Sequence, residues 1–274
     1  KANYDWFVFL DSDDYWNQGY LSSAICVIQN YNPDMIIYNY QSVSENGKVL
    51  FQPKDVWEDG HVITSNSKEE LYKVISSSKI FNGIVKKIVH RRIVDLEKDY
   101  SVFNDKKGED ILQSIPLFKN ASIIVYKTDR YYNYRMSVTG RGRNFKSKYV
   151  YDAECVSTQL YTFLCEECGA ESDITKSMLR KYLTKVGDEA VNIFVYERNV
   201  STAKKICREI TSFKLFNIAI KSIRIDSLPI KTKNRINRLI HEKYFCFMLT
   251  ALKKKIFDRI RYFIKHYNTR TEAI

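Results

Sequence analysis

Short apolar runs and helical repeats follow one another along the first half of the chain. Apolar runs of strand length occupy residues 6–10 and 35–40. Between them, apolar side chains at spacings of three and four predict a helix over residues 20–28. The first run is uninterrupted, which is typical of a strand buried on both faces. The pattern therefore predicts an α/β fold for this half.

Turn and cap signals add further elements to the first half. Asn46-Gly47 predicts a hairpin turn into a strand at residues 49–51. Ser67 with Glu70 forms a capping box that predicts a helix ending near Ser76. A short helix and two strands are also predicted, at residues 108–118, 121–127 and 130–136.

The pattern changes near residue 145, where strand signals end and helical repeats continue to the end of the chain. The predicted helices cover residues 146–168, 173–197, 201–213, 232–243 and 244–267. A glycine-containing loop at 140–143 separates the two patterns. We therefore predict an α/β domain over residues 1–145 and an all-α region over 146–274.

Charge distinguishes the last part of the helical region. The chain has a net charge of +12, and residues 200–274 carry 18 basic against 5 acidic side chains. Such a block favours anionic partners such as a phospholipid surface, and no nucleic-acid-binding motif accompanies it. The six cysteines are spread through the sequence without a second pair for the CxxC at 165–168, so they indicate neither a disulfide framework nor a zinc site.

Acidic residues follow the first apolar run directly. Asp11, Asp13 and Asp14 come at its end, and alternation along a strand would point Asp11 and Asp13 to the same side. Ligands in α/β sheets bind outside the carboxyl ends of strands, and neighbouring carboxylates suit Mg²⁺ or Mn²⁺. The same residues would also suit a solvated acidic turn before the next helix.

Two further features carry candidate chemistry. Glu109 and Asp110 stand at a predicted helix start, where an acid is either a helix cap or a candidate general base. In the tyrosine-rich strand at 130–136, alternation places Arg135 on one face and Tyr132 and Tyr134 on the other. Arg135 is a candidate clamp for a diphosphate.

In this order and spacing, the three features resemble family 2 glycosyltransferases of the GT-A fold, of the bacterial polysaccharide and cell-wall type. Residues 4–16 look like the strand and DxD block of that family, Gly108-Glu109-Asp110 like its ED motif, and 132–135 like its tyrosine-rich strand. The resemblance covers about residues 1–145. It implies the C-terminal part of a GT-A domain, with a Rossmann-like mixed sheet, followed by a basic all-α extension.

The resemblance also implies an activity. A nucleoside-diphosphate sugar, by expectation a UDP-sugar, would donate its sugar with inversion to a glycan or lipid-linked acceptor. Asp13, assisted by Asp11 or Asp14, would hold Mn²⁺ or Mg²⁺, and Arg135 would bind the diphosphate. Within the Glu109-Asp110 motif, Asp110 would be the catalytic base. The nucleotide-binding segment that opens the family has no counterpart here, so we expect a piece of a longer enzyme that binds UDP poorly by itself.

Two other classes of function fit parts of the sequence. A hydrophobic strand followed by DxD also begins haloacid-dehalogenase-like phosphatases, although Tyr15 and Trp16 fit that family poorly. A non-catalytic basic module that binds membranes is the second alternative.

The last predicted helix provides the surface that would bind a membrane. Residues 245, 249, 252, 256, 260, 263 and 267 form one apolar stripe, flanked or opposed by basic residues at 253–255, 259, 261 and 265. A cytoplasmic enzyme held peripherally on the inner face of a membrane is the expectation. The same repeat is also typical of a helix that packs on its neighbours.

Overall fold

The computed structural model describes residues 4–97, 99–103, 106–136 and 146–271, with side chains described as far as Asp258 and again at Ile260. The chain divides into two compact units. Unit 1 comprises residues 1–143 and 158–177, and unit 2 comprises residues 144–157 and 178–274. The predicted functional division into 1–145 and 146–274 stays a prediction.

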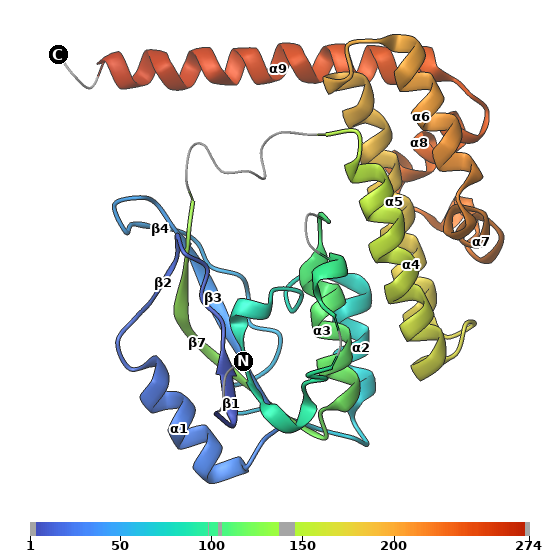
Figure 1. Ribbon diagram of the computed structural model, residues 1–274. Helices are drawn as coiled ribbons and strands as arrows, with labels where there is room; N and C mark the ends of the chain where they lie inside the picture. The colour runs from blue at the N-terminus through green and yellow to red at the C-terminus, as the bar shows by residue number, and fades with distance from the viewer. Residues whose placement is uncertain (1–3, 98, 104–105, 137–145, 272–274) are drawn as a thin grey trace. The chain divides into compact units, whose positions relative to one another are not determined.

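Unit 1 is built on a mixed sheet of seven strands (Figure 1). Along the main path the strands are β1 (Trp6–Val8), β6 (Lys87–His90), β3 (Met35–Val43), β7 (Ile123–Arg135) and β2 (Tyr15–Trp16). Strand β4 (Val49–Phe51) pairs with β3, as the hairpin prediction required, and β5 (Val62–Thr64) pairs with β7. Strands β3 and β7 run parallel, and the other described pairs are antiparallel.

Helices cover both faces of the sheet. Helix α1 (Tyr20–Tyr31) packs Tyr20, Ala24 and Val27 on one face, against alternate side chains of β3, β6 and β7. Helices α2 (Lys68–Ser77) and α3 (Glu109–Asn120) lie on the other face (Figure 1). The α/β prediction for the first half is confirmed.

Two strand predictions are wrong in detail. Strand β1 ends at Val8 and is half-buried, because it stands at the end of the sheet path and pairs with β6 alone among the described strands. The two strands predicted at 121–127 and 130–136 are one strand, β7. The polar residues between the two predicted strands remain in β7, where Asp59 accepts a hydrogen bond from the backbone N–H of Thr128 (2.9 Å).

The predicted capping box does not form. Ser67 is the N-cap of α2, but its hydroxyl accepts from the backbone N–H of Thr64 (2.9 Å) rather than from the helix. The Ser67 side chain therefore closes the turn between β5 and α2, and the helix begins at Lys68 without a side-chain cap.

In the described residues from 146 onward, the regular elements are helices. They are α4 (Tyr149–Cys168), α5 (Asp173–Tyr196), α6 (Val200–Ser212), α7 (Lys214–Ser222), α8 (Ile230–Ile240) and α9 (Tyr244–Thr271), with a short 3-10 turn at Ile225–Ser227. The repeats predicted all of these helices except α7. That helix is short, and Phe213 alone separates it from α6.

Candidate active site

One pocket of unit 1 brings together two carboxylates that lie far apart in the sequence. Asp11, from the turn after β1, and Asp110, from the first turn of α3, both line a cavity of about 370 Å³. The rest of the lining comes from β3, the segment 79–86, the start of α3 and β7: Tyr40, Ser42, Lys79, Asn82, Gly83, Val85, Lys86, Gly108, Tyr132 and Tyr134.

The acidic residues after β1 stand in a turn rather than on a strand. The backbone N–H of Asp14 donates to the carbonyl of Asp11 (3.1 Å), which closes the turn. The argument from strand alternation for Asp11 and Asp13 is therefore wrong. The turn nevertheless leaves both side chains exposed while it buries Asp14.

Asp14 ties this turn to strand β7. Its carboxylate accepts one hydrogen bond from the hydroxyl of Tyr132 and another from the backbone N–H of Arg135 (2.7 Å). Burial, and then the bond to Asp14, raise the pKa of the Tyr132 hydroxyl. Both carboxylate oxygens of Asp14 thus have partners within the protein, and the residue fixes the turn.

Negative charge accumulates around the pocket. Partial burial of the Asp11 carboxylate raises its pKa, and repulsion from Asp14, Asp110, Asp13 and Glu109 adds to this effect. Glu109 accepts from the backbone N–H of Gly108 (3.0 Å), so its carboxylate lies at the start of α3. The structure therefore places all five acidic residues of the two motifs within electrostatic reach of one another.

Arg135 is not among the residues that line this pocket. Its guanidinium lies over the ring of Tyr15, 5.5 Å from the centroid, and the side chain is exposed. Tyr132 and Tyr134 face the pocket, as alternation along the strand predicts. The role of Arg135 as a diphosphate clamp stays a prediction.

Sequence reasoning missed the cations of the pocket wall. Lys86, in the short 3-10 turn Ile84–Lys86, is only 8 % exposed, and its ammonium donates to the carbonyl of Ile80. Burial lowers the pKa of Lys86 to about 8, while the charge of Asp110 acts in the opposite direction. Two adjacent lysines inside the apolar run 84–89 were the available signal.

Lys87 is a structural lysine. It is fully buried, and its ammonium donates to the carbonyls of Phe81 and Gly83 (2.7 Å each). Burial holds the pKa of Lys87 well below its usual range. The two lysines together therefore hold the backbone of residues 80–83, which forms one wall of the pocket.

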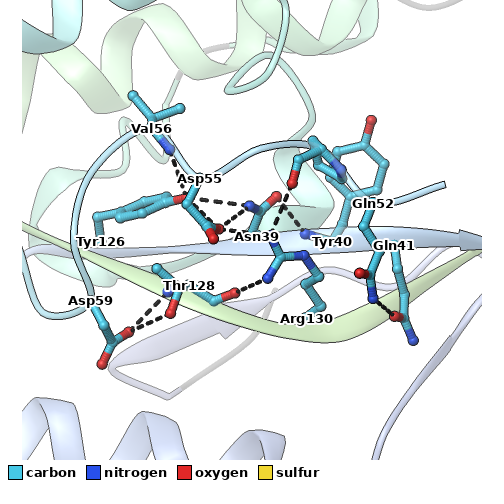
Figure 2. A network of polar contacts seen from close by, with 11 residues as sticks. Asn39, Tyr40, Gln41, Gln52, Asp55, Val56, Asp59, Tyr126, Thr128 and Arg130 are labelled. Atoms are coloured by element: carbon cyan, nitrogen blue, oxygen red, sulfur yellow. Dashed lines mark hydrogen bonds and ion pairs between the residues drawn. The ribbon is translucent and has the colours of Figure 1, made fainter.

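A polar network holds a loop behind the same wall (Figure 2). The carboxylate of Asp55 accepts from the side-chain amide of Asn39 (2.7 Å) and from the guanidinium of Arg130 (2.8 Å). Two residues further on, Trp57 stacks on Phe81 with ring centroids 5.2 Å apart. The network thus fixes the loop after β4, and the loop in turn supports residues 79–83.

The carboxylates fit a divalent cation only in part. Within the residues that the structure describes, no group of three or more His, Cys, Asp or Glu side chains could hold a metal ion. Mg²⁺ is commonly held by one or two carboxylates together with water and substrate phosphates. The exposed, mutually repelling Asp11 and Asp13 suit that arrangement.

Comparison with known proteins finds a family match for the first part of the chain. Residues 1–94 match the model of glycosyl transferase family 2. None of the curated proteins matches the chain. This match confirms the resemblance to family 2 glycosyltransferases for residues 1–94, about a third of the chain.

One solved structure supports the predicted GT-A type of fold. The chain is similar to residues 1–349 of TarS from S. aureus, with a TM-score of 0.51 and 16 % identity over 87 % of this chain. It spans 66 % of that TarS chain, just under two thirds. A second structure of TarS 1–349, in complex with UDP-GlcNAc, gives a TM-score of 0.45 at 16 % identity, covering 87 % of this chain and 67 % of the other.

Proposed function

We propose that this chain carries the DxD turn and the acceptor side of a glycosyltransferase. The enzyme would move a sugar from a nucleoside-diphosphate sugar, by expectation a UDP-sugar, to a glycan or lipid-linked acceptor in bacterial surface polysaccharide synthesis. The observation that carries this proposal is the single pocket lined by Asp11 and Asp110. The family 2 match over residues 1–94 supports the class of reaction.

The roles we propose follow from the position of each residue. Asp110 lines the pocket and would remove the proton of the acceptor hydroxyl, so that the oxygen attacks the sugar from the face opposite the leaving group, with inversion. Glu109 would hold the start of α3 in place beside it. Asp13 and Asp11 would hold Mn²⁺ or Mg²⁺, which when bound would neutralise charge on the departing diphosphate.

The test is transfer from UDP-sugars by the full-length protein, measured as UDP release. Asp13→Ala should abolish transfer that depends on Mn²⁺, whereas Glu45→Ala, which removes an exposed acid of the same unit, should leave it unchanged. Undiminished transfer by the Asp13 variant would refute the metal role. A covalent phosphate on Asp11 would instead favour the phosphatase alternative.

We propose further that the enzyme is cytoplasmic and works peripherally on the inner face of a membrane, where a lipid-linked acceptor would be presented. Within the described residues, no helix combines the length and the apolar character needed to cross a bilayer. The basic composition of residues 200–274 supports attachment to an anionic surface.

A further inference from the structure

Helix α9 has two opposite apolar faces, and unit 2 covers only one of them. Tyr244, Phe247 and Ala251 are buried in the core of unit 2. On the other side, Phe245 is 69 % exposed and Ile256 57 % exposed. The same exposed face continues through further large apolar residues: Leu249, Leu252 and Ile260.

This exposure distinguishes the two sequence-based expectations for the described part of the helix. Packing on neighbouring helices would have buried the predicted stripe, and instead a different face is buried. We name residues 245, 249, 252, 256 and 260 the α9 stripe. The remaining residues that the prediction named, Phe263, Tyr267, Arg259, Arg261 and Lys265, have side chains outside the described residues.

Basic residues border the α9 stripe. At about 3.6 residues per turn, Lys253 and Lys255 project on its two sides, and both are exposed. Lys254 points to the covered face, where its ammonium donates to the amide oxygen of Asn192 (2.8 Å). An apolar band between exposed lysines is the pattern of a helix that lies in the interface of an anionic bilayer.

Charge favours an anionic surface over a second copy of the chain. Residues 200–274 carry 18 basic and 5 acidic side chains, so two such regions placed face to face would repel each other. An anionic lipid surface would attract the same charges and take up the apolar band.

We propose that the α9 stripe docks the protein on an anionic lipid surface, with the helix lying parallel to the membrane plane. The side chains of Phe245, Leu249 and Leu252 enter the boundary between headgroups and acyl chains, and Lys253 and Lys255 contact the headgroups. This inference rests on the proposed peripheral location and not on the transfer reaction, so vesicle binding and transferase activity can fail independently.

Co-sedimentation with vesicles tests the proposal on the whole chain. Vesicles of phosphatidylglycerol should bind the protein at low salt, and binding should weaken as salt is added; vesicles of phosphatidylcholine should bind at least tenfold less. Absence of binding to phosphatidylglycerol at low ionic strength, or equal binding to both lipids, would overturn the proposal.

Variants separate the apolar contribution from the charges. The triple variant Phe245→Ser, Leu249→Ser, Leu252→Ser should lose binding to phosphatidylglycerol by about tenfold or more, because its apolar band is interrupted. The double variant Lys253→Ala, Lys255→Ala should bind roughly 25-fold less, about fivefold for each lysine, with a weaker dependence on salt.

The matched control removes equally exposed apolar groups from unit 1, as Leu21→Ser, Ile25→Ser, Leu50→Ser. This control should bind vesicles as the unaltered chain does, and circular dichroism should show folded helices in every variant. Equal loss of binding in control and stripe variants would overturn the role of α9. Light scattering could instead show a dimer that the stripe variant dissociates, with no vesicle binding. That result would also overturn the proposal, since the stripe would then be an interface between copies of the chain.

Discussion

The ammonium group of Lys86 lies 4.6 Å from the ring centroid of Tyr40, and both side chains line the pocket that contains Asp110. The contact places a nearly buried cation on the face of an aromatic ring, within electrostatic reach of Asp110. An anionic donor entering this pocket would meet repulsion from the carboxylates, and Lys86 is positioned to reduce that repulsion.

We predict that Lys86 gives the enzyme an alkaline limit near pH 8. Its pKa is lowered by burial to about 8, so above that pH the ammonium loses its proton and the pocket becomes more negative. Donor binding should then weaken and KM should rise. Lys86→Met should lower kcat/KM by about tenfold at pH 7 and abolish the fall in activity near pH 8. Lys86→Arg should shift that fall in activity to higher pH.

Stability measurements distinguish this loss of activity above pH 8 from unfolding of the protein. Because the pKa of Lys86 is about 8 in the folded chain and 10.5 ordinarily, the folded state releases this proton first, and the group favours folding increasingly as pH rises from 8 to 10.5. Activity should therefore fall in a range where this lysine does not destabilise the fold. Lys48→Met, at an exposed turn, should keep the ordinary profile; an unchanged pH profile in Lys86→Met would refute the role.

Asp110→Asn tests the proposed base. The amide keeps the shape of the carboxylate but cannot take up a proton, so kcat should fall by roughly 100-fold or more. Donor binding, measured by calorimetry on the full-length protein, should persist. Retention of more than a tenth of the wild-type kcat would show that another group takes the proton.

Partial burial of Asp11, together with repulsion from its acidic neighbours, predicts the effect of a divalent cation on stability. The pKa of Asp11 is raised, so its ionised form is disfavoured in the folded state, and the stability that its protonated form contributes is lost as pH rises through the raised pKa. At neutral pH, Asp11→Asn should therefore raise Tm in the absence of metal. Mn²⁺ should raise the Tm of the unaltered chain more than that of the variant.

The control for this experiment is Glu45→Gln, which removes an exposed acid outside the pocket. It should change neither Tm nor the response to Mn²⁺. A lower Tm for Asp11→Asn without metal would contradict the repulsion, and equal Mn²⁺ responses in both proteins would place the cation elsewhere.

Local patterns predicted the elements and the acidic motifs, because these depend on residues close together in the chain. Helix α1, strand β3 and the start of α3 follow from spacing and turn residues alone. The end of β1 did not follow, since burial of an apolar strand depends on its place in the sheet, and that place is set by pairing with distant β6.

The candidate active site shows the same limit of prediction from local sequence. Asp11 and Asp110 were predicted from motifs, but their shared pocket depends on how the chain folds between them. Lys86 and Tyr40 carried no motif, and the role of Lys86 follows only from the residues that surround its ammonium. Asp14 belongs to a motif, yet its hydrogen bonds to Tyr132 and the backbone of Arg135 give it a structural task that the motif does not indicate.

The hydrogen bond between Asp14 and Tyr132 predicts that the Tyr132→Phe substitution lowers the stability of the protein. Tyr132→Phe removes the hydroxyl donor and leaves the buried carboxylate with the backbone N–H of Arg135 as its partner. The free energy of unfolding should fall by about 1–3 kcal/mol, the cost of an unsatisfied buried acceptor. Denaturant titration measures this change.

Tyr134→Phe is the matched control, because it removes a hydroxyl from the same strand at a side chain that is 46 % exposed. Its unfolding free energy should change by less than about 0.5 kcal/mol. Asp14→Ala in the Tyr132→Phe background should cost less than Asp14→Ala alone, since the two changes remove one shared hydrogen bond. Strict additivity of the two changes would mean that the hydrogen bond between Asp14 and Tyr132 contributes nothing to stability, and that Asp14 acts through its bond to the backbone of Arg135 alone.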